Sequence, residues 1–231
     1  MLTEIILLSF CGGLFCLDRI FIQTMISRPV VIAPFAGWLL NSPYEGLIIG
    51  ALVELFWIDR LPIGTYIPPN DSVAAVLATA VAVIGGQKSG ITSPEMIALA
   101  ILLTVPFGII AGKIDTLIIE SNDVLSDQAL ADAAAGDVRR IEYKSYRGLA
   151  KTFLSTAACL FAGQALLVPA VIWLYPRLGA AVLNALLLVY YFLPLLGIAV
   201  ALNTIKMRGA VPVFCALFLL ITVIGEFFHV L

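Results

Sequence analysis

Charged side chains are scarce in this chain. Only 12% of its 231 residues are Asp, Glu, Lys or Arg, about half of the share near 25% that soluble domains carry. Hydrophobic residues make up 61% and form long runs along the whole length. No basic stripe interleaved with aromatic residues is present, which excludes nucleic acid as a partner. The composition instead predicts an all-α, polytopic integral membrane protein whose surroundings are a lipid bilayer.

Histidine and clustered cysteine are lacking as well. The one histidine, His229, lies near the C-terminal end, and Cys11, Cys16, Cys159 and Cys215 lie in apolar segments without metal-ligand spacing. We expect these cysteines to be small buried side chains. P-loop, GxSxG, HExxH and CxxC motifs are absent. The sequence therefore predicts no metal or other cofactor, no enzyme acting alone, and no phosphoryl carrier on this chain.

A long polar interval divides the chain at residues 120–151. Its second half carries five basic residues, and basic residues close to membrane ends favour the cytoplasmic side. We therefore expect 120–151 to be a cytoplasmic, Ala-rich helical loop between an N-terminal membrane region at 1–119 and a C-terminal membrane region at 152–231. The five basic residues are Arg139, Arg140, Lys144, Arg147 and Lys151.

The C-terminal region contains three apolar segments, at 152–174, 179–204 and 210–231. Each is long enough to cross roughly 30 Å of hydrocarbon at about 1.5 Å per residue. Two crossings from a cytoplasmic start return the chain to Lys206 and Arg208. Both basic sites thus favour the same topology, which places the C-terminus outside.

The N-terminal region is less regular. Residues 2–17 and 95–119 are typical of spanning or near-spanning helices, and 72–85 of a shorter one. The apolar stretches 28–40 and 45–58 are too short to cross and are bounded by polar or helix-breaking residues. Backbone that breaks at membrane depth must be buried in protein or line a cavity. We therefore expect broken or re-entrant helices here, of the kind that point to a transporter's binding site.

The window 53–71 places polar groups inside this interrupted region. Glu54 is the most deeply embedded acid, and such a group more often faces a cavity or a partner than lipid. Asn70 and Asp71 follow two prolines and offer both donors and acceptors. Structural roles are the alternative: protonation or an arginine partner for Glu54, and capping of the next helix for Asn70 or Asp71.

Carboxylates, amides and an aromatic face together suit a sugar, whose hydroxyls donate and accept while its ring carbons present C–H groups. Trp57 is the candidate aromatic face, with an interfacial anchor as its alternative role. Gln23 and Arg28 lie at another segment junction and could add an amide and a fixed donor. A structural pair between Arg28 and Glu54 is the competing interpretation.

Three stretches resemble a known family. They are "LDRIFIQTMISRP" (17–29), "EGLIIGALVELFWI" followed by "LPIGTYIPPND" (45–71), and "YYFLPLLGIAVALNTIKMRGAVPVFCALFLL" (190–220). In order and spacing they are similar to the membrane-spanning IIC subunit of the mannose/sorbose-type phosphoenolpyruvate-dependent sugar phosphotransferase systems (PTS).

The resemblance implies a sugar permease subunit in the inner (plasma) membrane. Such a subunit works in a hetero-oligomer with the membrane subunit IID, while soluble IIA and IIB proteins supply the phosphoryl group. A hexose-type sugar is bound within the membrane and passed inward for phosphorylation by IIB. The family's substrate-site acids map onto Glu54 and onto Asn70-Asp71, where relatives usually place an acid directly after the prolines.

Two other functions remain open at this point. One is a paralogue of the same family that has lost transport and acts as a sensing or scaffold subunit. The other is an ion-coupled secondary sugar transporter, which would need neither IIA nor IIB. Neighbouring genes or a pull-down would distinguish the three.

Overall fold

The computed structural model describes residues 1–60, 66–205 and 209–227. Its described part is helical and without strands, and four of its helices are long and apolar enough to cross a bilayer. The all-α membrane fold predicted from composition is confirmed. The helices are α1 Leu2–Cys16, α2 Pro29–Leu39, α3 Pro43–Phe56, α4 Asp71–Ser89, α5 Pro94–Ala134, α6 Val138–Leu174, α7 Ala180–Ile205 and α8 Ala210–Phe227, with short 3-10 turns at Leu17–Arg19 and Tyr175–Arg177.

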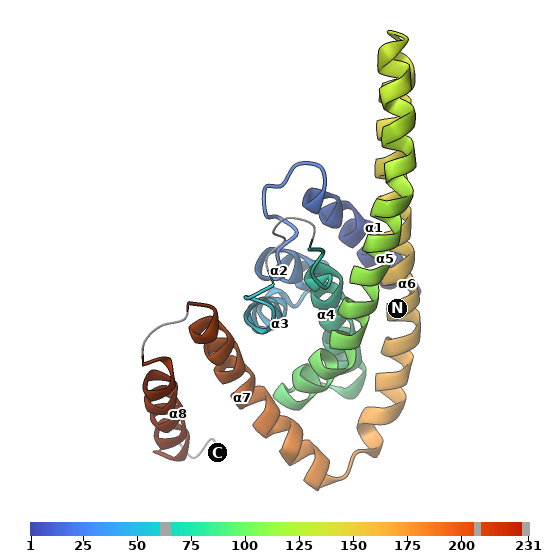
Figure 1. Cartoon of the computed structure of the whole chain (residues 1–231). Helices are drawn as coiled ribbons and strands as arrows, with labels where there is room; N and C mark the ends of the chain where they lie inside the picture. Colours follow the sequence, from blue (N-terminus) through green and yellow to red (C-terminus); the bar gives the residue numbers. More distant parts are fainter. Residues whose placement is uncertain (61–65, 206–208, 228–231) are drawn as a thin grey trace.

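Helix α4 is the centre of the bundle (Figure 1). It packs against α1, α2, α3, α5 and α6, and every residue from Ser72 to Gly86 is buried. Its sequence is rich in alanine and valine, so neighbouring helices can approach it closely from all sides. At 19 residues it is longer than the 14-residue segment expected from the sequence.

Helices α2 and α3 form a short, tightly packed pair. They have 11 and 14 residues, which corresponds to only about 16 and 21 Å of helix. The contact is made at Gly46 and Gly50 of α3, a small-xxx-small motif that lets two helix backbones touch. A Cβ atom at Gly46 would lie 2.4 Å from the Ala33 carbonyl oxygen, and one at Gly50 would lie 2.4 Å from that of Pro29. These are the two short segments that the sequence predicts.

Helices α5 and α6 form a long antiparallel hairpin whose tip extends well beyond the other helices (Figure 1). Residues 120–151 are therefore the continuous ends of two helices of 41 and 37 residues joined by a tight turn. Asp137 caps α6 by accepting a bond from the Arg140 N–H at 3.2 Å. An ion pair between Lys144 and Asp132 joins the two helices near the tip.

Helices α7 and α8 form an arm beside the bundle. Helix α7 packs against α3 and α5, and α8 packs against α7 (Figure 1). Large apolar side chains on α8, such as Val211, Leu219 and Val223, are exposed. In a chain of this composition such a surface faces lipid or another membrane subunit.

Candidate functional site

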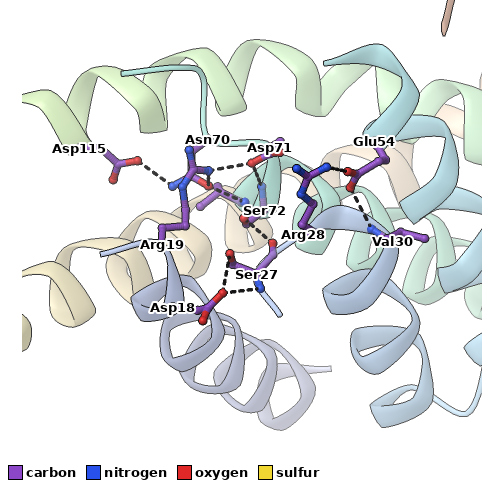
Figure 2. Close-up of polar contacts among 11 residues, drawn as sticks. Asp18, Arg19, Ser27, Arg28, Val30, Glu54, Asn70, Asp71, Ser72 and Asp115 are labelled. Carbon is purple, nitrogen blue, oxygen red and sulfur yellow. Dashed lines mark hydrogen bonds and ion pairs between the residues drawn. The ribbon is translucent and has the colours of Figure 1, made fainter. Parts of the chain in front are cut away.

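Polar side chains from four parts of the chain converge above the N-terminus of α4. They come from the 17–30 segment between α1 and α2, the end of α3, the start of α4 and the middle of α5. Figure 2 shows two neighbouring sets of hydrogen bonds and ion pairs, one between Arg28, Glu54 and the Val30 N–H and one that runs from Asp18 to Asp115. We refer to this group as the polar cluster, and it consists of Asp18, Arg19, Ser27, Arg28, Glu54, Asn70, Asp71, Ser72 and Asp115.

Glu54 forms an ion pair with Arg28. The Arg28 guanidinium donates to Glu54 Oε1 at 2.5 Å, and the Val30 N–H donates to Oε2 at 3.4 Å. Arg28 is the N-cap of α2 and Glu54 lies in the last turn of α3, so the pair depends on the tight packing of these helices. Their side chains are 40% and 18% exposed, which leaves both accessible to a ligand. The structure thus contains the ion pair between Arg28 and Glu54 that the sequence offered as an alternative role for Glu54.

Asp71 pairs with a different arginine. Arg19 donates to Asp71 Oδ1 at 2.7 Å and to Asn70 Oδ1 at 3.2 Å. Asn70, which is 2% exposed, also donates through Nδ2 to Asp115 at 2.8 Å. Asn70 therefore connects the Arg19 guanidinium to a second carboxylate, that of Asp115. It is also the N-cap of α4, since its Oδ1 accepts from the Val73 N–H at 3.0 Å, whereas Asp71 occupies the first helical position.

The backbone leading to Asn70 is held against α5. The Asn70 N–H donates to the Gly108 carbonyl at 2.8 Å. A Cβ atom at Gly112 would lie 2.9 Å from Pro69 Cα, so a second pair of glycines four residues apart permits a close approach. Pro68 and Asn70, in the non-helical stretch directly before α4, are thus buried against α5, as broken backbone at membrane depth must be.

Asp18 organises the segment between α1 and α2. Its carboxylate accepts from the backbone N–H and hydroxyl of Thr24, and from those of Ser27 at 3.3 Å. The Ser72 hydroxyl then donates to the Ser27 carbonyl at 2.6 Å. Since Ser27 precedes Arg28 and Ser72 follows Asp71, this bond joins the two ion pairs into one structure.

Gln23 and Trp57, the two remaining candidates, lie outside the polar cluster. Gln23 is exposed on the 17–30 segment with a positive φ of 57°. Trp57 is 8% exposed and belongs to the hydrophobic core. It packs close to Gly108, where a Cβ atom would lie 2.9 Å from its ring. Trp57 thus forms part of the packing beneath the segment that carries Asn70.

Sequence reasoning did not single out Arg19, Asp18 or Asp115 as site residues. Asp115 had a usable signal, because an acid inside a long apolar segment more often faces a cavity or partner than lipid. Arg19 and Asp18 had none, since they follow α1 at a position where interfacial charges are common. Their part in the cluster depends on contacts across 52 and 9 residues of sequence.

The arrangement offers paired donors and acceptors that suit a polyhydroxylated ligand. Each ion pair is partly exposed, so its carboxylate keeps unused lone pairs and its guanidinium keeps unused N–H groups. A sugar diol can bridge such a pair, accepting from the arginine and donating to the carboxylate. In the described residues no group of three or more His, Cys, Asp or Glu side chains is arranged to hold a metal ion.

Comparison with known proteins places the chain in a family. The family model described as "PTS system sorbose-specific iic component" matches residues 2–230. The putative N-acetylgalactosamine permease IIC component 2 of Escherichia coli (strain K12) is 28% identical over 110 residues, which cover 46% of this chain and 80% of that protein. The PTS system sorbose-specific EIIC component of Lacticaseibacillus casei is 24% identical over 84 residues, 36% of this chain and 30% of that protein.

Solved structures show the same fold. One, described as the structure of a membrane protein, matches with a TM-score of 0.72 at 18% identity, covering 100% of this chain and 95% of that one. Another, in the cryo-electron microscopy structure of the mannose transporter ManYZ with microcin E492, matches with a TM-score of 0.61 at 18% identity, covering 99% and 92%. Since the family model matches nearly the whole sequence, the chain belongs to the sorbose-specific IIC family of PTS membrane components.

Proposed function

We propose that this IIC component binds a hexose-type sugar at the polar cluster and passes it inward for phosphorylation by IIB. The observation that carries the proposal is the pair of partly exposed ion pairs, Arg28–Glu54 and Arg19–Asp71, joined through the Ser27–Ser72 bond. Both occur where the backbone of a membrane chain is interrupted, which is where transporters bind their substrates.

Within this proposal the six residues expected from the sequence have distinct roles. Arg28, Glu54 and Asp71 contact the sugar hydroxyls directly. Asn70 contacts the sugar or positions Arg19 and Asp115 around it, because its amide already bonds to both. Gln23 is exposed on the 17–30 segment and adds an amide. Trp57 supports the site by packing near Gly108, whose carbonyl accepts from the Asn70 N–H.

The proposal gives the phosphoryl chemistry to partner proteins. The chain works in a hetero-oligomer with IID in the plasma membrane, and phosphorylated IIB acts on the sugar at the cytoplasmic side. The family match supports this division of labour. The sequence motifs agree, because no P-loop or other nucleotide signature is present.

Uptake of labelled sugars tests this function. In cells that express IID and IIB, adding this chain should produce uptake of one or more members of a panel of hexoses and amino sugars, including N-acetylated ones. The accumulated sugar should be phosphorylated, and uptake should stop when IIB is removed. Uptake that continues without IIB would favour an ion-coupled transporter. No uptake of any sugar by a normally inserted complex would favour a sensing or scaffold subunit.

Cysteine labelling tests the proposed topology. In a cysteine-free background, Ser145→Cys on the hairpin should not react with a membrane-impermeant maleimide added outside, because 120–151 is expected in the cytoplasm. Gly179→Cys, in the turn between α6 and α7, should react. Both positions are exposed, and a Cβ atom at Gly179 meets no other atom within 4 Å. The reversed pattern would require the inverted orientation.

A further inference from the structure

The α5–α6 hairpin carries an open groove where its helices leave the apolar region. The groove has a volume of about 550 Å³ and lies between the two helices. It contains two cations, a hydroxyl, an amide and two apolar side chains, and no acid is among its lining residues. Those residues are Ser121, Val124, Leu125, Gln128, Arg147 and Lys151.

The two cations of the groove are available to a ligand. Arg147 and Lys151 form no ion pair with any residue in the described part of the chain, and the structure gives their side chains no hydrogen bond there. The next lysine on the same helix, Lys144, is occupied by Asp132 and by the Gln128 carbonyl. Two unpaired cations one helical turn apart therefore face one concave surface, which favours an anionic group with several acceptor oxygens.

The groove lies at the depth of lipid headgroups. The apolar run of α6 begins at Phe153, so Lys151 stands about 3 Å above the hydrocarbon at 1.5 Å per residue. The α5 residues that line the groove extend from 121 to 128, or about 10 Å along the helix. The headgroup region on each side of a bilayer is roughly 5–8 Å thick. The lower half of the groove thus coincides with that region.

The same face of the hairpin continues into the membrane as an exposed apolar track. Leu117 is four residues before Ser121 and Leu154 is three residues after Lys151, so each lies one turn below the groove on the same helix face. Both leucines are 64% exposed. A cationic groove above an apolar track matches a phospholipid, with its phosphate above and its acyl chains below.

The geometry points to a binding site for an anionic phospholipid in this groove, with Arg147 and Lys151 bound to the headgroup phosphate. The Ser121 hydroxyl and the Gln128 amide add donors to the headgroup, and Leu117 and Leu154 contact the acyl chains. Basic pockets between transmembrane helices on the cytoplasmic side bind such headgroups. This site is independent of the sugar site proposed above.

Lipid binding by the purified full chain, together with any subunit that co-purifies, tests the site. The probes are phosphatidylglycerol and phosphatidylcholine with a fluorophore on the acyl chain, titrated in detergent micelles and read by fluorescence anisotropy. The parent should prefer phosphatidylglycerol. Each single change, Arg147→Gln or Lys151→Gln, should weaken the binding of phosphatidylglycerol about fivefold, and the double change should weaken it about twentyfold. Phosphatidylcholine binding should not change.

Matched variants make the result specific. Arg139→Gln/Arg140→Gln removes the same charge from the same helix near the hairpin tip and should leave binding within about twofold of the parent. Arg147→Lys/Lys151→Arg keeps both charges and should retain binding, even if the neutral variants fold poorly. Glycerol phosphate and inorganic phosphate at millimolar concentration should not displace the lipid, because they lack acyl chains.

Three outcomes would overturn the proposal. Phosphatidylglycerol binding that is unchanged in the Arg147→Gln/Lys151→Gln variant would exclude these cations as its ligands. Displacement by inorganic phosphate as effectively as by lipid would identify a general anion site. An Arg147→Gln/Lys151→Gln variant that binds lipid like the parent but no longer captures phosphorylated IIB would assign the groove to a protein partner instead.

Discussion

Replacing Glu54 by glutamine should lower sugar affinity by about ten- to a hundredfold. The substitution keeps the shape and one acceptor but removes the charge, and a charge-assisted hydrogen bond contributes roughly 1.5–3 kcal/mol. It also leaves Arg28, now 2.5 Å from the carboxylate, without its anionic partner. Binding is measured by titrating the purified complex with the sugar that the uptake experiment identifies. Asp71→Asn should behave similarly, because it breaks the pair with Arg19 while the cap of α4, Asn70, is kept.

Loss of folding must be separated from loss of binding. Asp132→Asn is the matched control, because it breaks another interhelical ion pair, to Lys144 on the hairpin, far from the sugar site. It should leave sugar affinity unchanged whatever it does to the thermal midpoint. If Glu54→Gln and Asp71→Asn accumulate normally with IID and bind the sugar like the parent, the polar cluster is not the sugar site.

Replacing Gly50 by alanine should strongly destabilise the protein and disturb the site. The added Cβ would lie 2.4 Å from the Pro29 carbonyl oxygen and 3.1 Å from Ala33 Cβ. Backbone cannot rotate away as a side chain can, so α2 and α3 must separate. Forcing extra atoms into a packed core costs about 1–3 kcal/mol and occasionally more. Because Arg28 is the N-cap of α2, the separation should also pull it away from Glu54 and weaken sugar binding.

The thermal midpoint of the purified protein and its abundance in the membrane measure the effect. Gly85→Ala is the control, since a Cβ at Gly85 would make contacts of 3.4 Å with side-chain atoms of Met96 and Val171, which is ordinary van der Waals distance. That variant should be close to the parent in both measurements. A Gly50→Ala protein as stable as the control would show that α2 and α3 do not depend on this close contact.

Composition and local pattern were sufficient for the class of fold. The low charge content and the length of the apolar runs predict membrane helices, because a bilayer selects segments by length and polarity alone. The two short segments, 28–40 and 45–58, were predicted for the same reason. The family was also recognisable, since its stretches keep their order along the chain. The polar interval 120–151 was identified, but its form as two continuous helix ends required the structure.

The partners of the charged groups were decided by the tertiary structure. Arg28 with Glu54, Arg19 with Asp71 and Asn70 with Asp115 lie 26, 52 and 45 residues apart. Hydrophobic periodicity describes each helix separately and does not state which end of one helix meets which end of another. The packing of α4 among five neighbours, made possible by its small residues, brings these ends together. Asp115 and Arg19 therefore become members of the site only when the bundle is assembled.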